Sequence, residues 1–120
     1  MKNASAPPGQ ADEGFGCVPT AAEMERGVHK AADLLRSLAH PQRLGILCML
    51  IERERTVSEL MHELGMRQST VSQQLQRLRS EHLVQCRREG KNVYYRLADP
   101  APRAIIETLH GIYCLKRAHD

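Results

Sequence analysis

Residues 56–97 contain, in order, the patterns of a short helix, a tight turn, a second helix and a β-hairpin. Thr56 and Glu59 stand three residues apart, the spacing at which a hydroxyl and a carboxylate cap a helix start by each accepting the other's backbone N–H. Gly65 is the residue that can leave this helix in a left-handed conformation. We therefore expect a first helix that ends at Gly65 and is followed directly by a turn.

The second helix, over residues 68–79, has one apolar and one polar face. Val71, Leu75 and Leu78 recur at spacings of four and three, which places them on a common buried face. The polar face offers hydroxyls and carboxamides, which pair with base edges and phosphates in a DNA major groove. An ordinary solvated helix would show the same pattern, so this segment alone leaves both interpretations open. The candidate DNA contacts are Gln68, Ser69, Thr70, Ser72, Gln73, Gln74 and Arg77.

The hairpin that follows favours DNA binding. Residues 84–97 alternate like two strands around Glu89 to Asn92, with Val93, Tyr95 and Leu97 on one face. A basic hairpin directly after a polar helix is typical of a wing that grips the phosphate backbone. The fold class we predict is mainly α with a β-hairpin wing, a winged helix-turn-helix. The candidate wing contacts are Arg87, Arg88, Lys91 and Asn92, with Arg96 close by.

Composition narrows the partner to duplex DNA. The net charge of the 120 residues is only +3, so the basic residues must act locally. Aromatic residues make up 3% of the chain, which leaves few platforms on which single-stranded bases stack.

We expect residues 1–19 to form a disordered tail rich in proline and glycine, and residues 20–120 to form one domain for DNA binding and dimerisation. Without a long apolar run, the chain is expected to be cytoplasmic and not membrane-bound.

Two terminal helices are predicted to pair copies of the chain. The first helix starts at Thr20, where Glu23 completes a second capping pattern, and ends near His40; a further helix begins at Pro41. The last helix, about 103–116, is apolar over more than half of its circumference. Broad apolar faces on so small a chain favour a homodimer, which would present two recognition helices about 34 Å apart to a palindromic operator.

Four segments together resemble the ArsR family of winged-helix repressors. These are Leu35-Arg-Ser-Leu-Ala-His-Pro-Gln-Arg-Leu44, Val57-Ser-Glu-Leu60, Ser69-Thr-Val-Ser-Gln-Gln-Leu75 and Gly90-Lys-Asn-Val-Tyr-Tyr-Arg96. The resemblance covers about residues 24–116. It implies a homodimer that releases operator DNA when an inducer binds, and many members of the family sense metals.

The metal ligands of that family are missing from this sequence. Where thiolate-based sensors carry Cys-x-Cys, this chain has Met61-His62-Glu63, which offers no thiolate to a soft cation. The last helix offers only His110 and, at its end, His119 and Asp120. We therefore expect neither a metal site nor another cofactor, and keep a response to a metal ion or a general oxidant as the alternative function.

Cys48 and Cys114 resemble the thiol pair of the persulfide-responsive BigR/SqrR/HlyU-like branch of the family. The resemblance implies that reactive sulfur species join these two thiols by a di-, tri- or tetrasulfide. Either cysteine alone would be more typical of a small core residue, and it is the match of both to the family positions that favours a sensing pair. His110 precedes Cys114 by four residues, where its cation would activate the thiol; a solvated or dimer-facing histidine is the alternative.

Cys86 and Cys17 indicate less about function, and two other classes of protein are disfavoured. We expect Cys86 to be structural, and Cys17 to be inert in the tail or accessory to the thiol pair. A thiol-disulfide enzyme is disfavoured because the chain lacks CxxC and shows no nucleophile and base constellation, so we predict no enzyme activity. A protein-interaction module on the same fold would lack salt-dependent affinity for duplex DNA. The predicted function is a DNA-binding repressor that senses reactive sulfur.

Overall fold

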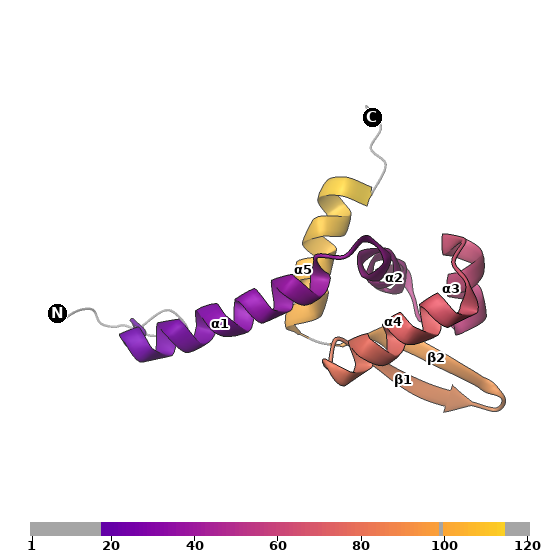
Figure 1. Cartoon of the computed structure of the whole chain (residues 1–120), viewed down its shortest axis with the longest axis horizontal. Coiled ribbons are helices and arrows are strands. Elements are labelled where there is room, and N and C mark those ends of the chain that lie inside the picture. The colour runs from indigo at the N-terminus through magenta and orange to yellow at the C-terminus, as the bar shows by residue number, and fades with distance from the viewer. Residues whose placement is uncertain (1–17, 99, 115–120) are drawn as a thin grey trace. The chain divides into compact units, whose positions relative to one another are not determined.

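The computed structural model describes residues 18–98 and 100–114. The chain divides into two compact units, Met1–Leu35 and Arg36–Asp120. The expected tail falls almost wholly outside the described residues, as do His119 and Asp120. The elements are α1 (Ala21–Leu38), α2 (Pro41–Glu52), α3 (Val57–Leu64), α4 (Gln68–Ser80), β1 (Val84–Glu89), β2 (Asn92–Leu97), α5 (Ala101–Leu109) and a π-helical turn (His110–Cys114), as Figure 1 shows.

Helix α1 begins with the predicted capping pair. The backbone N–H of Thr20 donates to Glu23 Oε1 at 2.9 Å, and the N–H of Glu23 donates to Thr20 Oγ1 at 3.0 Å. The helix ends at Leu38, two residues before the expected end at His40. Several of its apolar side chains are exposed, among them Val28 and Leu35.

Helix α3 is closed at both ends as predicted. The N–H of Thr56 donates to Glu59 Oε1 at 2.9 Å, and Thr56 Oγ1 accepts the N–H of Glu59 at 3.2 Å. The backbone hydrogen bond with Thr56 lowers the pKa of the Glu59 carboxyl. Gly65 ends the helix with φ +65° and donates its N–H to the Met61 carbonyl. These two ends fix the turn that leads into α4.

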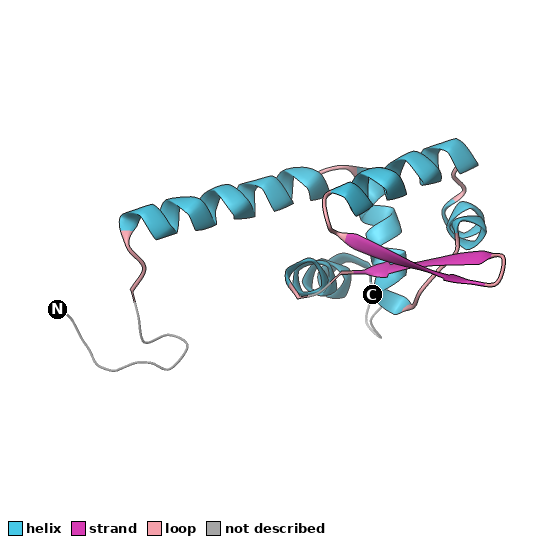
Figure 2. Ribbon diagram, turned by 90° about the horizontal axis from the view of Figure 1, so that it is seen from below, coloured by secondary structure: helices cyan, strands magenta, loops and turns pink. Residues whose placement is uncertain are grey.

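The hairpin has the predicted limits. Strands β1 and β2 are antiparallel, pair Val84 with Leu97 and Glu89 with Asn92, and are joined through Gly90 at φ +63° (Figure 2). A third backbone segment, at Arg55, pairs with strand β2, and sequence analysis did not predict this pairing. Arg55 pairs with Tyr95: the N–H of Arg55 donates to the Tyr95 carbonyl at 3.1 Å, and the N–H of Tyr95 donates back at 2.8 Å.

The core of the second unit surrounds α2, which contacts α3, α4, β2 and α5. The spacing of Leu44, Leu47, Cys48 and Ile51 predicts one apolar face for α2, and this prediction is partly wrong. Ile46, Leu47 and Leu50 are buried, while Cys48 is only half-buried. A helix with neighbours on several sides buries more than one narrow stripe, and each buried side chain of this size contributes about 1.5–3 kcal/mol. The largest fully buried side chains are Ile46, Leu47, Leu50, Leu60, Val71, Leu75, Leu78, Val84, Leu97 and Ile106.

The last helix differs from the single helix expected over 103–116. It starts two residues earlier, at Ala101, because a proline is tolerated in the first turn of a helix. From His110 to Cys114 the backbone widens into a π-helical turn, which local spacing does not predict. Ile106 is buried, whereas Ile112 and Tyr113 are exposed. Among the described helices, none is long and apolar enough to cross a membrane.

Candidate functional site

Helix α4 presents the predicted polar face. The side chains of Val71, Leu75 and Leu78 are buried and anchor the helix. α4 contacts α3 on one side and β1 on the other, so the polar face and the wing belong to one packed unit (Figure 1). Gln68, Ser69, Ser72, Gln73 and Arg77 are exposed, and Thr70 and Gln74 are half-buried.

Two of these side chains are engaged within the protein. The carboxamide oxygen of Gln74 accepts a hydrogen bond from Arg43 Nε at 2.9 Å, while Arg43 Nη1 donates to the Ser37 carbonyl at 3.0 Å. Arg77 Nε lies 3.4 Å from Glu81 Oε2. Arg43 was missed by sequence analysis, because its partner Gln74 lies 31 residues away.

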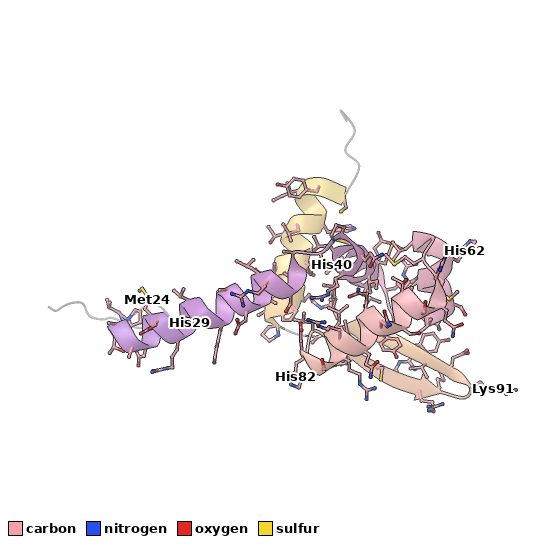
Figure 3. All side chains as sticks on the ribbon, viewed as in Figure 1. Met24, His29, His40, His62, His82 and Lys91 are labelled. Carbon is pink, nitrogen blue, oxygen red and sulfur yellow. The ribbon has the colours of Figure 1, made fainter. Side chains whose placement is uncertain are left out.

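The wing carries Lys91 at its tip, where the side chain points away from the hairpin (Figure 3). Arg87 behaves differently from the other predicted wing residues. Its guanidinium pairs with Glu54 Oε1 at 2.8 Å and with Glu89 Oε1 at 2.9 Å, and lies 4.7 Å from the centroid of the Tyr94 ring. Hydrogen bonds to the two carboxylates raise the pKa of Arg87 above its usual range, and the bond to Glu54 has the larger effect.

These ion pairs change which residues supply the positive charge of the wing. Two carboxylates neutralise the charge around Arg87, so Arg88 and Lys91 carry the excess at the tip. Both are exposed, as are Asn92 and Arg96. Free surface cations of this kind suit phosphate contacts that do not depend on sequence.

The thiols of Cys48 and Cys114 meet at the junction of α2 and the π-helical turn. Their Sγ atoms lie 3.9 Å apart, although 66 residues separate them in the chain. Cys48 is half-buried and Cys114 is exposed, and both are free thiols. Burial, helped by the neighbouring Cys114 and Glu52, raises the pKa of Cys48 to about 11.

His110 is buried, which contradicts the alternative of a solvated side chain. Its Nε2 lies 3.4 Å from Glu52 Oε2. Glu52 was not singled out from the sequence, because nothing in the spacing of the chain relates the end of α2 to the last helix. The carboxylate of Glu52 therefore belongs to the surroundings of the thiol pair.

In the part of the chain that the structure describes, the remaining cysteine and histidines form no second cluster of metal-binding side chains. Cys86 is a half-buried free thiol in β1, opposite Tyr95, and Cys17 lies outside the described residues. His62 is exposed on α3 (Figure 3). Within residues 18–98 and 100–114, no group of three or more His, Cys, Asp or Glu side chains is placed to hold a metal ion.

A polar recognition helix followed by a basic hairpin defines a transcriptional regulator of the winged helix-turn-helix class. The profile described as "Bacterial regulatory protein, arsR family" matches residues 40–85. Together with the relatives below, this match shows that the chain belongs to the arsR family of bacterial regulatory proteins.

Curated relatives and solved structures are similar over most of their lengths. The chain is 45% identical over 92 residues to the "Transcriptional activator HlyU" of Vibrio cholerae, covering 77% of this chain and 85% of that protein. It is 45% identical over 91 residues to the "Biofilm growth-associated repressor" of Agrobacterium fabrum, covering 76% and 78%. The crystal structure of the transcriptional repressor BigR from Xylella fastidiosa superposes with a TM-score of 0.77 at 39% identity, covering 82% of this chain and all of that one.

Proposed function

We propose that the chain is a repressor that binds operator DNA as a homodimer and releases it when reactive sulfur species join Cys48 to Cys114. The observation that carries the proposal is the 3.9 Å separation of the two Sγ atoms, which are neighbours already in the reduced protein. The resemblance to the persulfide-responsive branch of the family points to the same pair. A regulator of this kind acts on DNA in the cytoplasm, where thiols stay reduced until an oxidised sulfur species reaches them.

The two thiols have different parts in the chemistry. The exposed Cys114 attacks first: its thiolate takes the terminal sulfur of a persulfide, the sulfur–sulfur bond of the donor breaks, and the donor leaves as a thiolate. Cys48 then attacks the Sγ atom of Cys114, the added sulfur leaves as HS⁻, and the product is a disulfide. If Cys48 also carries an added sulfur, that terminal sulfur attacks instead, HS⁻ leaves again, and the product is a trisulfide.

The separation of the thiols favours a longer bridge. A disulfide requires the Sγ atoms to approach to about 2.05 Å, nearly 2 Å closer than in the reduced protein. Two such bonds meeting at a central sulfur span about 3.3 Å, so a trisulfide would fit with a much smaller movement. This difference would make the protein more responsive to persulfides than to peroxide, which supplies no sulfur atom.

Dimerisation is supported by apolar surface in both terminal elements. Helix α1 exposes Met24, Val28 and Leu35, and the π-helical turn exposes Ile112 and Tyr113, the last to 79%. Exposed apolar patches of this kind mark surfaces that bind other proteins. A two-fold dimer would present two α4 helices to a palindromic site. Sedimentation equilibrium tests this directly, and a monomer at concentrations that saturate DNA would contradict it.

The experiment that tests the sensing function measures DNA affinity and sulfur chemistry on the same samples. Fluorescence anisotropy with labelled promoter DNA compares reduced protein with protein treated with glutathione persulfide, glutathione disulfide or hydrogen peroxide. Persulfide should weaken binding by about 5–150-fold, the usual range of allosteric coupling. Mass spectrometry should show the two cysteines linked, with about 32 Da added for each extra sulfur.

Three single substitutions provide the variants and the control. Cys48→Ser and Cys114→Ser should bind DNA when reduced and keep it after treatment. Cys86→Ser removes a thiol outside the pair and should release DNA like the unaltered protein. Release by the two serine variants, or unchanged affinity after the bridge has formed, would contradict the proposal. Equal release by peroxide would identify a general oxidant sensor, and release by metal salts a metal sensor.

A further inference from the structure

The carboxylate of Glu52 connects the thiol pair to a buried arginine. Glu52 is the last residue of α2, one turn after Cys48. Its Oε2 lies 3.4 Å from His110 Nε2, and its Oε1 lies 2.9 Å from Arg55 Nη2. His110 opens the π-helical turn that ends at Cys114. A single side chain thus contacts the segment that carries the second thiol and a residue beyond the end of α2.

Arg55 in turn holds the elements that bear on DNA. Its side chain is 5% exposed, and its Nη1 lies 3.7 Å from Glu63 Oε2 in α3, the helix that precedes the recognition helix. Its Nε donates to the Met49 carbonyl at 3.3 Å. Its backbone forms the two hydrogen bonds to Tyr95 of the wing. A buried guanidinium depends on its partners, because an unpaired charge away from water is strongly unfavourable.

We propose that Glu52 is the coupling residue through which the sulfur bridge between Cys48 and Cys114 alters α3 and the wing. This inference rests on the proposed function. Closing the bridge pulls the π-helical turn toward α2, which moves the His110 imidazole relative to Glu52. The carboxylate then shares its two oxygens differently between His110 and Arg55, and Arg55 readjusts against Glu63 and Tyr95. The DNA-fitting arrangement is thereby disfavoured.

A physical link of this kind is needed because a ligand shifts an equilibrium only through contacts that differ between the two states. The thiols lie in α2 and in the π-helical turn, whereas the candidate DNA contacts lie in α4 and the wing. The contacts from His110 through Glu52 to Arg55, with separations of 3.4 and 2.9 Å, connect the turn that carries Cys114 to a residue that contacts α3 and β2.

The test uses Glu52→Gln, which keeps the size of the side chain and removes its charge. DNA affinity before and after persulfide treatment is measured by anisotropy, and the sulfur bridge by mass spectrometry. We expect reduced Glu52→Gln still to bind DNA and to form the bridge fully, and its own affinity in the reduced state is the reference for the effect of the bridge. The affinity ratio between reduced and bridged protein, about 5–150 in the unaltered chain, should fall toward 1. Glu107→Gln, an exposed carboxylate on α5, is the matched control and should leave the ratio unchanged.

A second measurement keeps the test valid if Glu52→Gln does not fold. In the unaltered protein, hydrogen exchange of the Arg55 and Tyr95 amides reports on the β-bridge between them, and its rate should change when the sulfur bridge closes. Unchanged exchange there, or full release of DNA by bridged Glu52→Gln, would overturn the coupling role while leaving sensing intact. If the unaltered protein forms the bridge without releasing DNA, the proposed function itself fails, and the coupling role with it.

Discussion

The Sγ atoms of Cys48 and Cys114 face each other across 3.9 Å, and Cys114 is the more exposed of the two thiols. Because one thiol is exposed and the other is half-buried, we expect the two thiols to react one after the other. The exposed sulfur is the one that an external persulfide meets, and the half-buried sulfur is already in place to attack the product.

The reactivity of Cys48 provides the first prediction. Burial raises the pKa of Cys48 from 9.0 to about 11, which lowers its thiolate population about 100-fold at neutral pH. A thiolate of higher pKa is also more nucleophilic, by roughly tenfold here, so the net loss of reactivity is about tenfold. Cys48 should therefore be alkylated about tenfold more slowly than a cysteine in an unfolded peptide. Pulsed alkylation followed by mass spectrometry measures both rates. Equal rates would contradict the reduced reactivity of Cys48.

The pH dependence of this reaction follows from the direction of the shift. Because the folded protein holds the Cys48 thiol neutral, its alkylation rate should keep rising as the pH increases from 9 toward 11, whereas an ordinary thiol levels off near 9. Cys114→Ala removes the hydrogen bond and the neighbouring charge but leaves burial, the largest cause. Cys48 in this variant should react faster than in the unaltered protein, and still more slowly than the peptide.

Recognition helix and wing are predicted to differ in their effect on DNA affinity. Lys91→Ala removes a cation at the exposed tip of the hairpin, so binding should weaken on every duplex, and the slope of log affinity against log salt should fall by about 0.9. Gln73→Ala, on the exposed face of α4, should reduce discrimination between operator and altered operator by about 1–3 kcal/mol without changing the slope. Anisotropy at several salt concentrations separates the two effects. Identical behaviour of the two variants would contradict this division.

Features set by residues close in sequence were predictable from the chain. Thr56 and Glu59 cap α3, Gly65 ends it, and the hairpin over 84–97 has the expected limits, because each depends on the chemistry of a few neighbouring residues. The polar face of α4 followed from helical periodicity in the same way. Periodicity could not predict which residues form ion pairs with the exposed charged side chains.

Contacts between distant residues were beyond such spacing arguments. The run Glu52-Arg-Glu-Arg55 is typical of a solvated segment, yet Arg55 is buried and pairs with Glu52, Glu63 and the backbone of Tyr95. The π-helical turn and the burial of His110 likewise depend on how the last helix packs on α2. Cys48 and Cys114 were paired by family resemblance, and only the fold supplies their separation.

The capping pair of α3 should contribute measurably to stability. Thr56→Ala removes the oxygen that accepts the Glu59 N–H, and this should lower the free energy of unfolding by about 1 kcal/mol. Ser58→Ala changes an exposed hydroxyl in the same turn and serves as the control, with an expected effect within about 0.5 kcal/mol. Urea unfolding followed by circular dichroism measures both. Equal losses from the two substitutions would show that the cap is not the cause.

Glycine-to-alanine substitution should change stability in opposite directions at two positions. An added Cβ would meet nothing within 4 Å at either Gly27 or Gly65, so steric contact does not distinguish them. Gly27 lies inside α1, where alanine is the better helix former by about 0.8–1 kcal/mol. Gly65 has φ +65°, a left-handed conformation that costs a residue with a Cβ roughly 1–2 kcal/mol.

Gly27→Ala should therefore raise the thermal midpoint of helix loss, and Gly65→Ala should lower it, in scans monitored by circular dichroism. The second substitution should also weaken DNA binding, because Gly65 sets the turn between α3 and the recognition helix. The double variant should show the sum of the two stability changes, because Gly27 and Gly65 belong to different compact units of the chain. A stabilising effect of alanine at Gly65 would mean that the turn adopts another conformation in solution.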